Sequence, residues 1–403
     1  MRVKIQKGVA NGTVFAPPSK SMAHRLLICA ALAHGKSVIT NLGSNADILA
    51  TLDSLKKLGA KINLVGNTAE VEGFDPKNIL DSPLLDCNES GSTLRFLLPL
   101  GMLCGKEVHF TGSTKLLQRP LTVFEEICKE KGVKFTLTPE KVTVCGQLKS
   151  GEYTVLGNIS SQFISGLLFL LPLLEGDSVI NIVGGVESRS YIDLTISALK
   201  QFGVSVAWQG DSLQILGNQS YKPQNLSVEG DYSGTAFFAG LNALGSQIEI
   251  KGLNESSLQG DKVYEKHFVA LQNGTPEIDL TDCPDLAPIL FAVASQLNGA
   301  TFVGTKRLKI KESDRAEAMR QELEKLGAKV IVNENSVIIE KSQLHSPTEP
   351  IFGHNDHRIV MSLAVLCTLY GGEILGAEAV SKSFPDFFEK LANLGIEVEK
   401  LDS

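Results

Sequence analysis

Cationic side chains stand at the start of several predicted helices, where the helix dipole disfavours them. Residues 17 to 25 read Pro-Pro-Ser-Lys-Ser-Met-Ala-His-Arg, and the apolar run Leu26–Ala33 follows at once. Ser19 is a good N-cap, so Lys20 and Arg25 fall in the first two turns of a helix. A helix N-terminus prefers Asp or Glu, and a cation added beside its free N–H groups favours the binding of an anion. A single such cation is more often a solvated surface residue, but this chain repeats the arrangement.

Five further segments place polar or cationic residues at predicted helix starts. They are Asn88–Arg95, Ser160–Phe163, Glu187–Asp193, Lys309–Arg315 before a helix over 316–326, and Asn355–Arg358 before a helical run over 359–366. Four of these segments hold an Arg within about a turn of the helix start, whereas the Ser160 segment offers hydroxyls and an amide. Guanidinium binds both phosphate and carboxylate as a bidentate fork, so the set predicts a site for anionic ligands that carry these groups.

Two isolated cations and two carboxylates complete the candidate set. Arg119 precedes a Pro at a loop-to-helix junction, and Lys382 precedes a short aromatic helix. Asp285 runs into an apolar segment, which leaves two interpretations open: a partly buried carboxylate with a raised pKa, or a simple helix cap. Glu312, beside a lysine, is the second candidate for proton transfer.

Composition and absent motifs argue against several classes of function. The net charge of −7 disfavours nucleic-acid or anionic-membrane partners, and no apolar stretch reaches the roughly 18 residues of a membrane span. The chain lacks a P-loop, a dinucleotide fingerprint, a His-Glu-x-x-His motif and a nucleophile elbow. Seven cysteines without a Cys-x-x-Cys pair argue against a disulfide framework or a thiolate zinc site. We therefore expect a cytoplasmic protein that uses no metal ion and no cofactor.

The elements that must position these residues follow a repeat. An amphipathic helix, a glycine near its C-terminus and an alternating strand recur at Gly59, Gly132, Gly203, Gly327 and Gly395, and more weakly at Gly274. In chain order the spacings between these glycines are 73, 71, 71, 53 and 68 residues. One or two such joints occur in any α/β protein, but six at near-even spacing predict six related αβ units.

Six units over 403 residues divide naturally into three plus three. A joint is predicted near residues 217–224, which are polar and include a Pro, and a second crossing near residues 11–13. We therefore expect an N-terminal domain of residues 14–221. A C-terminal domain would combine residues 1–13, including an N-terminal strand, with 222–403. A site in the cleft between the two domains would follow.

Taken together, these motifs resemble the 5-enolpyruvylshikimate-3-phosphate synthase family, in order and over about residues 1–400. The motifs are Pro18-Ser19-Lys20-Ser21 with Arg25, Ser160-Ser161-Gln162, Lys311-Glu312-Ser313-Asp314-Arg315 and Asn355-Asp356-His357-Arg358. The resemblance implies an α/β fold of two inside-out, barrel-like domains, each of three repeated αβ units, joined by a double-crossover hinge. It implies a monomer that transfers the enolpyruvyl group of phosphoenolpyruvate to the 5-hydroxyl of shikimate 3-phosphate. Phosphate is then released by addition and elimination.

The resemblance also implies which residues touch each substrate. Those for shikimate 3-phosphate are Lys20, Ser21, Arg25, Ser160, Ser161, Gln162, Ser188, Tyr191, Asp285 and Lys311. Those for phosphoenolpyruvate are Lys20, Gly91, Arg119, Gln162, Arg315, Arg358 and Lys382. The implied catalytic residues are Lys20, Asp285, which would take the proton of the 5-hydroxyl, and Glu312, which would donate a proton to the methylene carbon.

Two departures and two alternatives accompany the resemblance. Either Asn88 or Glu89 fills a position that is usually Asn, and Arg307 stands where a neutral Asn is common. The first alternative, UDP-N-acetylglucosamine enolpyruvyl transferase, usually has Asn where Ser21 follows the lysine, and a reactive Cys that residues 116–120 lack. The second alternative is a non-catalytic anion-binding protein of the same repeat fold. It would not need carboxylates such as Asp285 beside the cations.

Overall fold

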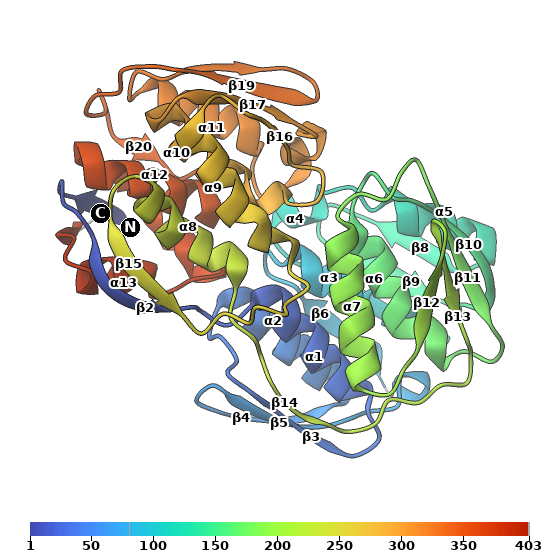
Figure 1. The fold of residues 1–403 in the computed structure, drawn as a ribbon. Helices are drawn as coiled ribbons and strands as arrows, with labels where there is room; N and C mark the ends of the chain where they lie inside the picture. Colours follow the sequence, from blue (N-terminus) through green and yellow to red (C-terminus); the bar gives the residue numbers. More distant parts are fainter. Residues whose placement is uncertain (80, 402–403) are drawn as a thin grey trace. The chain divides into compact units, whose positions relative to one another are not determined.

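The structure is a computed structural model that describes residues 1–79 and 81–401. The chain forms two compact units, drawn in Figure 1. The N-terminal unit is Pro18–Glu229, and the C-terminal unit combines Met1–Pro17 with the chain from Gly230 onward. Each unit has a hydrophobic core of its own.

The chain changes unit after Pro17 and Glu229, whereas the sequence placed these points after residues 13 and 221. Strand pairing explains the difference. Strand β2 (Asn11–Phe15) pairs in parallel with β15 (Gln247–Lys251) of the C-terminal unit. Strand β14 (Asn225–Ser227) pairs in parallel with β3 (Lys36–Thr40) of the N-terminal unit. Each crossing therefore follows a complete strand.

Five sheets share one strand order, in which a parallel pair is extended by two antiparallel strands. In the N-terminal unit these are β14-β3-β5-β4, with β5 (Thr68–Glu72) and β4 (Lys61–Val65); β6-β7-β9-β8 (Leu84–Asp86, Glu107–Thr111, Val142–Cys145, Lys134–Leu137); and β10-β11-β13-β12 (Gly151–Leu156, Ser178–Val183, Ser212–Ile215, Val206–Gln209). In the C-terminal unit they are β16-β17-β19-β18 (Glu277–Asp279, Gly299–Val303, Ser336–Glu340, Lys329–Val332) and β20-β21-β1-β22 (Ile351–Phe352, Gly372–Leu375, Arg2–Ile5, Val398–Leu401). The two antiparallel strands form a hairpin in four of the sheets, whereas in the fifth they are β1 and β22, which lie far apart in the sequence.

The sixth sheet, β15-β2, has two strands and lacks the hairpin. This explains the short interval of 53 residues between Gly274 and Gly327, because the chain runs from the helix that ends at Gly274 directly into the next repeat. Gly274 is also the one repeat glycine with extended backbone (φ 170°). The other five lie at positive φ, from 70° at Gly132 to 122° at Gly59, where a side chain would be strained.

Besides the short α4 (Thr114–Leu117), two helices belong to each repeat. In four repeats one helix follows each strand of the parallel pair; in the other two the first helix follows β2 or β14, which pairs in the sheet of the other unit. The first helices are α1 (Lys20–Leu32), α3 (Gly91–Leu97), α6 (Ser161–Leu170), α8 (Tyr232–Ala243), α10 (Ala287–Gln296) and α12 (His357–Tyr370). The second helices are α2 (Ala46–Leu58), α5 (Thr122–Lys131), α7 (Arg189–Gln201), α9 (Tyr264–Asn273), α11 (Arg315–Glu324) and α13 (Phe387–Asn393).

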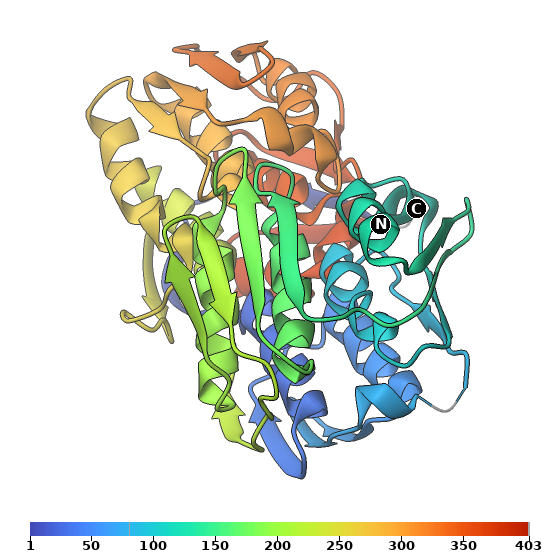
Figure 2. The same cartoon turned by 90° about the vertical axis from the view of Figure 1, so that its right-hand side faces the viewer.

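The first helices form the centre of each unit. Helix α1 is buried from Met22 to Leu32, and α12 from His357 to Thr368, so both are apolar on nearly every side. The sheets lie outside them with one face toward the helices; Figure 2 shows the sheet of β10 to β13, in green, over the helices of its own unit. Helices inside and sheets outside is the inside-out α/β arrangement that the resemblance implied.

The strand order also brings the helix starts together. In each parallel pair, such as β10 and β11, the two carboxyl ends lie at the same edge of the sheet. The helices that follow the two strands therefore begin at that edge, which is where ligands bind in open α/β sheets. The predicted anion-binding segments all lie at such helix starts.

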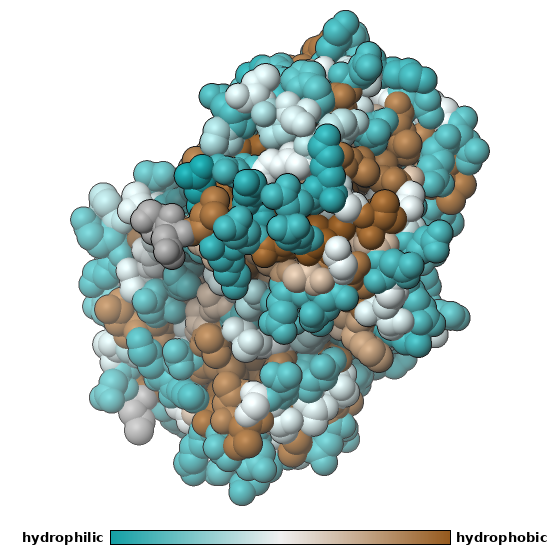
Figure 3. Space-filling view, turned by 90° about the vertical axis from the view of Figure 1, so that its left-hand side faces the viewer, coloured by the Kyte–Doolittle hydropathy of each residue, from teal (hydrophilic) through white to brown (hydrophobic). Residues whose placement is uncertain are grey.

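The surface in Figure 3 is mainly hydrophilic, with apolar side chains scattered among charged ones. Among the residues that the structure describes, no helix has both the length and the apolar character needed to cross a membrane.

Candidate active site

The start of α1 holds the first predicted cation in an ion pair. Ser19 caps the helix by accepting a hydrogen bond from the backbone N–H of Met22. Lys20 Nζ lies 2.8 Å from Oδ2 of Asp47, and both side chains are largely buried. Asp47 was not among the predicted site residues. Its place in the first turn of α2, after the N-cap Asn45, is ordinary for an acid, so the sequence offered no signal for it.

Arg25 connects α1 with α7. Its Nε donates to Oγ1 of Thr195 at 2.8 Å, and its Nη2 donates to the backbone carbonyl of Tyr191 at 2.8 Å. The guanidinium also lies over the ring of Phe96, 5.1 Å from the centroid. Burial lowers the pKa of Arg25 to about 10, although Tyr191 raises it in part. The guanidinium therefore remains charged at neutral pH and is fixed in place.

The starts of α3 and α6 meet through Gln162. Ser160 caps α6, and its hydroxyl accepts from the backbone N–H of Gln162 at 3.3 Å. The Gln162 side chain accepts from Arg95 Nη1 at 2.8 Å and donates to Ser92 Oγ at 3.0 Å. Arg95 and Ser92 therefore belong to the site, although the sequence assigned them no role of their own.

Gly91, the first residue of α3, provides room for a guanidinium. A Cβ atom on Gly91 would lie 2.7 Å from Nη1 of Arg119, so the end of the Arg119 side chain lies directly against this glycine. The structure thus brings together two residues that the sequence places in different motifs. Asn88 is exposed with a left-handed backbone (φ 50°), and Glu89 is half-buried; both precede the cap Ser90.

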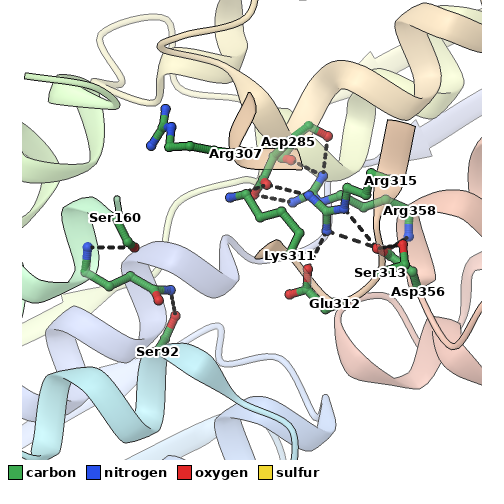
Figure 4. Close-up of polar contacts among 12 residues, drawn as sticks. Ser92, Ser160, Asp285, Arg307, Lys311, Glu312, Ser313, Arg315, Asp356 and Arg358 are labelled. Atoms are coloured by element: carbon green, nitrogen blue, oxygen red, sulfur yellow. Dashed lines mark hydrogen bonds and ion pairs between the residues drawn. The ribbon is translucent and has the colours of Figure 1, made fainter. Parts of the chain in front are cut away.

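In the C-terminal unit, Arg315 lies at the centre of a group of carboxylates. Asp314 caps α11, so Arg315 is its first residue, and its side chain is 1% exposed. Nη1 donates to Asp285 at 2.8 Å, and Nη2 donates to Glu312 at 2.7 Å. Nε donates to Asp356 at 2.9 Å. Figure 4 shows the guanidinium among these three side chains.

Asp285 in turn is shared by three cations. Besides Arg315, it lies 3.2 Å from Lys311 Nζ and 3.0 Å from Arg358 Nη2. Burial alone raises the pKa of Asp285, but the charges of Arg358, Lys311 and Arg315 overcome that effect and hold it well below its ordinary value. The prediction of a raised pKa was therefore wrong, because the sequence did not show that three cations from different segments converge here. Asp285 caps neither the short 3-10 turn η5 (Pro284–Leu286) nor α10.

A strained loop before α12 positions Arg358. His354 and Asn355 have positive φ (50° and 52°), a conformation that needs support. Buried Glu322 supplies it by accepting from the backbone N–H of Phe352 at 2.9 Å and pairing with His354 Nε2 at 2.7 Å. Lys382 Nζ donates to the carbonyl of Asn355 at 2.5 Å. Glu322 was not predicted, because its helical spacing is that of an ordinary core-facing residue.

The remaining predicted residues have the following places. Ser188 is the buried N-cap residue of α7, with φ 55°, and Tyr191 lies in the first turn of that helix. Ser21 accepts from Arg25 through its backbone carbonyl at 2.6 Å. Arg307 donates to the backbone carbonyl of Thr281 at 2.6 Å, and Figure 4 shows its guanidinium directed away from the Arg315 group. Among the described residues, no three His, Cys, Asp or Glu side chains gather where they could hold a metal ion.

Comparison with known proteins places this arrangement in a family. The model described as EPSP synthase (3-phosphoshikimate 1-carboxyvinyltransferase) matches residues 5–391. Proteins named 3-phosphoshikimate 1-carboxyvinyltransferase from Clostridium kluyveri and Clostridium perfringens are each 42% identical to this chain. The match covers 99% of the chain and 98% of the relative for the first, and 98% of both for the second.

Two solved structures of EPSP synthase from Acinetobacter baumannii share the fold. Their TM-scores are 0.77 and 0.80 at 23% and 21% identity, and the matches cover 99% and 100% of this chain and the whole of each solved chain. The two-unit α/β fold expected from the sequence is thereby confirmed. With the family model matching nearly the whole sequence, the chain belongs to the EPSP synthase family.

Proposed function

We propose that the cations at the helix starts bind the two substrates of the family reaction. In that reaction the enolpyruvyl group of phosphoenolpyruvate passes to the 5-hydroxyl of shikimate 3-phosphate, and phosphate is released. The reaction belongs to the shikimate pathway of aromatic amino-acid biosynthesis. The observation that carries the proposal is the convergence of Lys311, Arg315 and Arg358 on one partly buried carboxylate, Asp285. Such a group of cations can exchange that carboxylate for a substrate anion.

Phosphoenolpyruvate carries a phosphate and a carboxylate, and guanidinium suits both. We assign to it Lys20, Gly91, Arg119, Gln162, Arg315, Arg358 and Lys382. The fixed guanidinium groups of Arg315 and Arg358 support this assignment, since both are buried and already oriented by hydrogen bonds. Preoriented donors lose little entropy on binding and stabilise charge that develops during the reaction.

Shikimate 3-phosphate needs a phosphate site and partners for its hydroxyl groups. We assign to it Lys20, Ser21, Arg25, Ser160, Ser161, Gln162, Ser188, Tyr191, Asp285 and Lys311. Hydroxyl and amide side chains at helix N-termini, as at Ser160 and Ser161, supply neutral donors beside free backbone N–H groups. Such a mixture suits a phosphorylated polyol.

Asp285 is the proposed base for the 5-hydroxyl proton. Its carboxylate is ionised, but the three neighbouring cations make it a weak base in the free enzyme. When substrate anions engage Lys311, Arg315 and Arg358, their attraction for Asp285 weakens and the carboxylate becomes more basic. Substrate binding thus prepares the base, so proton transfer follows assembly of the complex.

The reaction then proceeds by addition and elimination. The 5-oxygen forms a bond to C2 of phosphoenolpyruvate as Asp285 takes its proton, and Glu312 donates a proton to the methylene carbon, giving a tetrahedral ketal phosphate. In the second step a proton leaves the new methyl group, the C2–O bond to phosphate breaks, and the enol ether forms. No bond to the enzyme and no cofactor enters this sequence. Lys20, held by Asp47, contributes positive charge to both substrates.

The proposal also includes a monomer that works in the cytoplasm. The seven free cysteines fit a reducing compartment.

Lys20→Met tests the proposal. We expect the variant to keep its circular dichroism spectrum and to lose release of phosphate from shikimate 3-phosphate and phosphoenolpyruvate, because the change removes charge from the site and not apolar packing from the core. The exposed Lys36→Met is the matched control and should retain full turnover. If Lys20→Met lost the circular dichroism spectrum of the folded protein, Lys20 would be needed for folding and the assignment to the substrates would be wrong. Phosphate release by the unaltered enzyme with UDP-N-acetylglucosamine but not with shikimate 3-phosphate would contradict the proposal.

A further inference from the structure

A chain of hydrogen bonds crosses the helices α1, α2 and α3 in the interior of the N-terminal unit. His24 Nδ1 lies 2.8 Å from Oγ1 of Thr51, which in turn lies 2.7 Å from Oγ1 of Thr93. The Thr93 hydroxyl donates to Oγ of Ser90, the N-cap of α3, at 2.7 Å. All four residues are 0% exposed. The hydrogen-bond chain that they form therefore connects α1, through α2, to the backbone at the beginning of α3.

This hydrogen-bond chain lies one helical turn from the ion pair that holds Lys20. His24 follows Lys20 by four residues on α1, and Thr51 follows Asp47 by four residues on α2. Residues four apart lie on the same face of a helix. The ion pair and the contact between His24 and Thr51 are therefore two parallel connections between the same two helices, each 2.8 Å long.

The direction of the hydrogen bonds follows from the number of protons. Each hydroxyl group has a single proton to donate. The Thr93 hydroxyl donates to Ser90, so its oxygen accepts from Thr51. Thr51 has then used its own proton, so it accepts from the Nδ1–H group of His24. The imidazole is thus the donor at which the hydrogen-bond chain begins.

The surroundings of His24 suit this role. Burial, Lys20 and Arg25 lower the pKa of His24 well below its ordinary value, so the ring is neutral and carries one proton. With that proton on Nδ1, Nε2 has only a lone pair. Nε2 is buried and has no hydrogen-bond partner in the described part of the protein, and the Nδ1–H form leaves no N–H group unsatisfied there. The edge-to-face ring of Phe96 packs against the imidazole, 6.4 Å between centroids.

The other end of the hydrogen-bond chain fixes the backbone beside Arg119. Ser90 Oγ also accepts from the backbone N–H of Thr93 at 3.1 Å, so the hydroxyl that ends the hydrogen-bond chain is itself the helix cap. Gly91 is the next residue, and a Cβ atom on it would lie 2.7 Å from Nη1 of Arg119. A displaced cap would therefore move the backbone against which that guanidinium lies. A buried polar network whose members are satisfied holds such a backbone in one arrangement.

We propose that His24 and Thr51 are positioning residues, which hold the backbone against which Arg119 lies when it binds phosphoenolpyruvate. They act through Thr93 and Ser90, and neither is assigned a contact with a substrate. The inference rests on the proposed role of Arg119 in binding phosphoenolpyruvate.

The test compares Thr51→Val, which keeps the shape without the hydroxyl, with Thr51→Ser, which keeps the hydroxyl. In Thr51→Val we expect KM for phosphoenolpyruvate to rise about fivefold, because the hydrogen-bond chain is broken at its centre. KM for shikimate 3-phosphate should be unchanged, because Lys20 keeps its ion pair with Asp47. Thr51→Ser should return KM for phosphoenolpyruvate to within about twofold of the unaltered enzyme.

This pair of variants separates positioning from stability. Thr51→Val loses hydrogen bonds and Thr51→Ser loses a buried methyl group, so both should lower the unfolding temperature. An effect on KM that came only from lower stability would appear in both variants. Ser54→Ala is the matched control, because Ser54 is a buried residue of the same helix whose hydroxyl has no hydrogen-bond partner among the described residues. It should leave both KM values unchanged.

A second pair of variants tests the donor end. His24→Leu cannot donate a hydrogen bond, whereas the amide of His24→Asn can place an N–H group near the position of Nδ1. We expect KM for phosphoenolpyruvate to rise about fivefold in the first and to be restored in the second. The double variant of Thr51→Val and His24→Leu should raise this KM no further than Thr51→Val alone, because both changes break one connection.

Arg119→Gln separates the possible failures. If it raises KM for phosphoenolpyruvate but Thr51→Val and His24→Leu do not, the inference is overturned and the proposed function stands. If Arg119→Gln leaves this KM unchanged, the proposed role of Arg119 is wrong and the inference falls with it. A rise in both KM values that Thr51→Ser shares would show that Thr51 only supports the fold, which also overturns the inference. If Thr51→Val did not fold, His24→Leu and His24→Asn would decide in the same way.

Discussion

Carboxylates of the chain itself neutralise several cations of the candidate site. Asp47 holds Lys20, and Asp285 is shared among Lys311, Arg315 and Arg358. Buried cations without partners would destabilise the fold by several kcal/mol. The internal acids therefore let the protein keep its anion-binding groups buried and ordered before substrate arrives, and the substrate anions then compete with those acids.

Gly91 gives a prediction at the scale of a single residue. A methyl group there would lie 2.7 Å from Nη1 of Arg119, so Gly91→Ala must displace that guanidinium. The displaced group is the end of a flexible side chain, so we expect stability to change by less than about 0.5 kcal/mol. KM for phosphoenolpyruvate should rise about tenfold, with KM for shikimate 3-phosphate unchanged, because a misplaced positioning group weakens binding of its own ligand. Steady-state kinetics and thermal unfolding check both parts.

Gly66 offers the control for this substitution, because a Cβ atom there would meet no other atom within 4 Å. Its positive φ of 56° predicts that Gly66→Ala lowers stability but leaves both KM values unchanged. Unchanged KM for phosphoenolpyruvate in Gly91→Ala would contradict the assignment of Arg119 to that substrate.

The sequence predicted the cations of the site better than their partners. Lys20, Arg315 and Arg358 were found because each stands beside its own helix cap, a signal contained within a few residues. Asp47 was missed because an acid near a helix start is ordinary, and its contact comes from another segment of the chain. The same non-local contacts decide the pKa of a carboxylate, which is why the prediction for Asp285 had the wrong direction.

At the scale of elements, the candidate residues are positioned by one fixed relation between strands and helices. Both helices of a repeat follow parallel strands and begin at one edge of the sheet. The binding side chains lie at the helix starts, and the preceding loops, such as residues 353–356, orient these side chains. These loops are strained where they must turn sharply, so neighbouring helices hold them by specific bonds.

Glu322 provides a prediction for such a loop. Glu322→Gln removes the charge that pairs with His354 and Lys325, and we expect it to lower the free energy of unfolding by about 3 kcal/mol at pH 7. Burial raises the pKa of Glu322, but His354, Lys325 and the N–H of Phe352 bring it below its ordinary value. Its contribution is therefore present above the unfolded pKa of about 4.3 and is lost as the pH falls through the lower folded pKa. Urea unfolding at several pH values measures the difference, which should shrink below about pH 4.

Glu317→Gln is the matched control on the same helix, because Glu317 pairs with the partly exposed Arg320. An exposed pair of this kind contributes about 0.5 kcal/mol. Equal losses in the two variants would contradict the role given to Glu322.

At the scale of the whole molecule, the repeat explains both what was predictable and what was not. Six glycine-capped joints gave the number of units, because helix caps are local signals. Two features depend on which strands pair: the hairpin is missing after Gly274, and the chain completes β2 and β14 before it crosses to the other unit. Strands that pair lie up to hundreds of residues apart in the sequence, so no local signal shows them. The expected boundaries therefore fell inside β2 and before β14, so neither strand was placed whole in the unit where it pairs.

The N-terminal unit should fold alone if its boundary is as the structure places it. Its buried core runs from Met22 to Val228, and the segment is continuous, so residues 18–229 expressed alone should unfold cooperatively in urea. A shorter segment, 18–221, lacks β14, which pairs with β3, and lacks Val228, whose carbonyl accepts from Asn41 at 2.7 Å. Loss of this strand and of buried Val228 should reduce stability by about 3 kcal/mol. Equal midpoints for the two segments would show that β14 does not stabilise the unit, and a non-cooperative transition of 18–229 would show that its core depends on the rest of the chain.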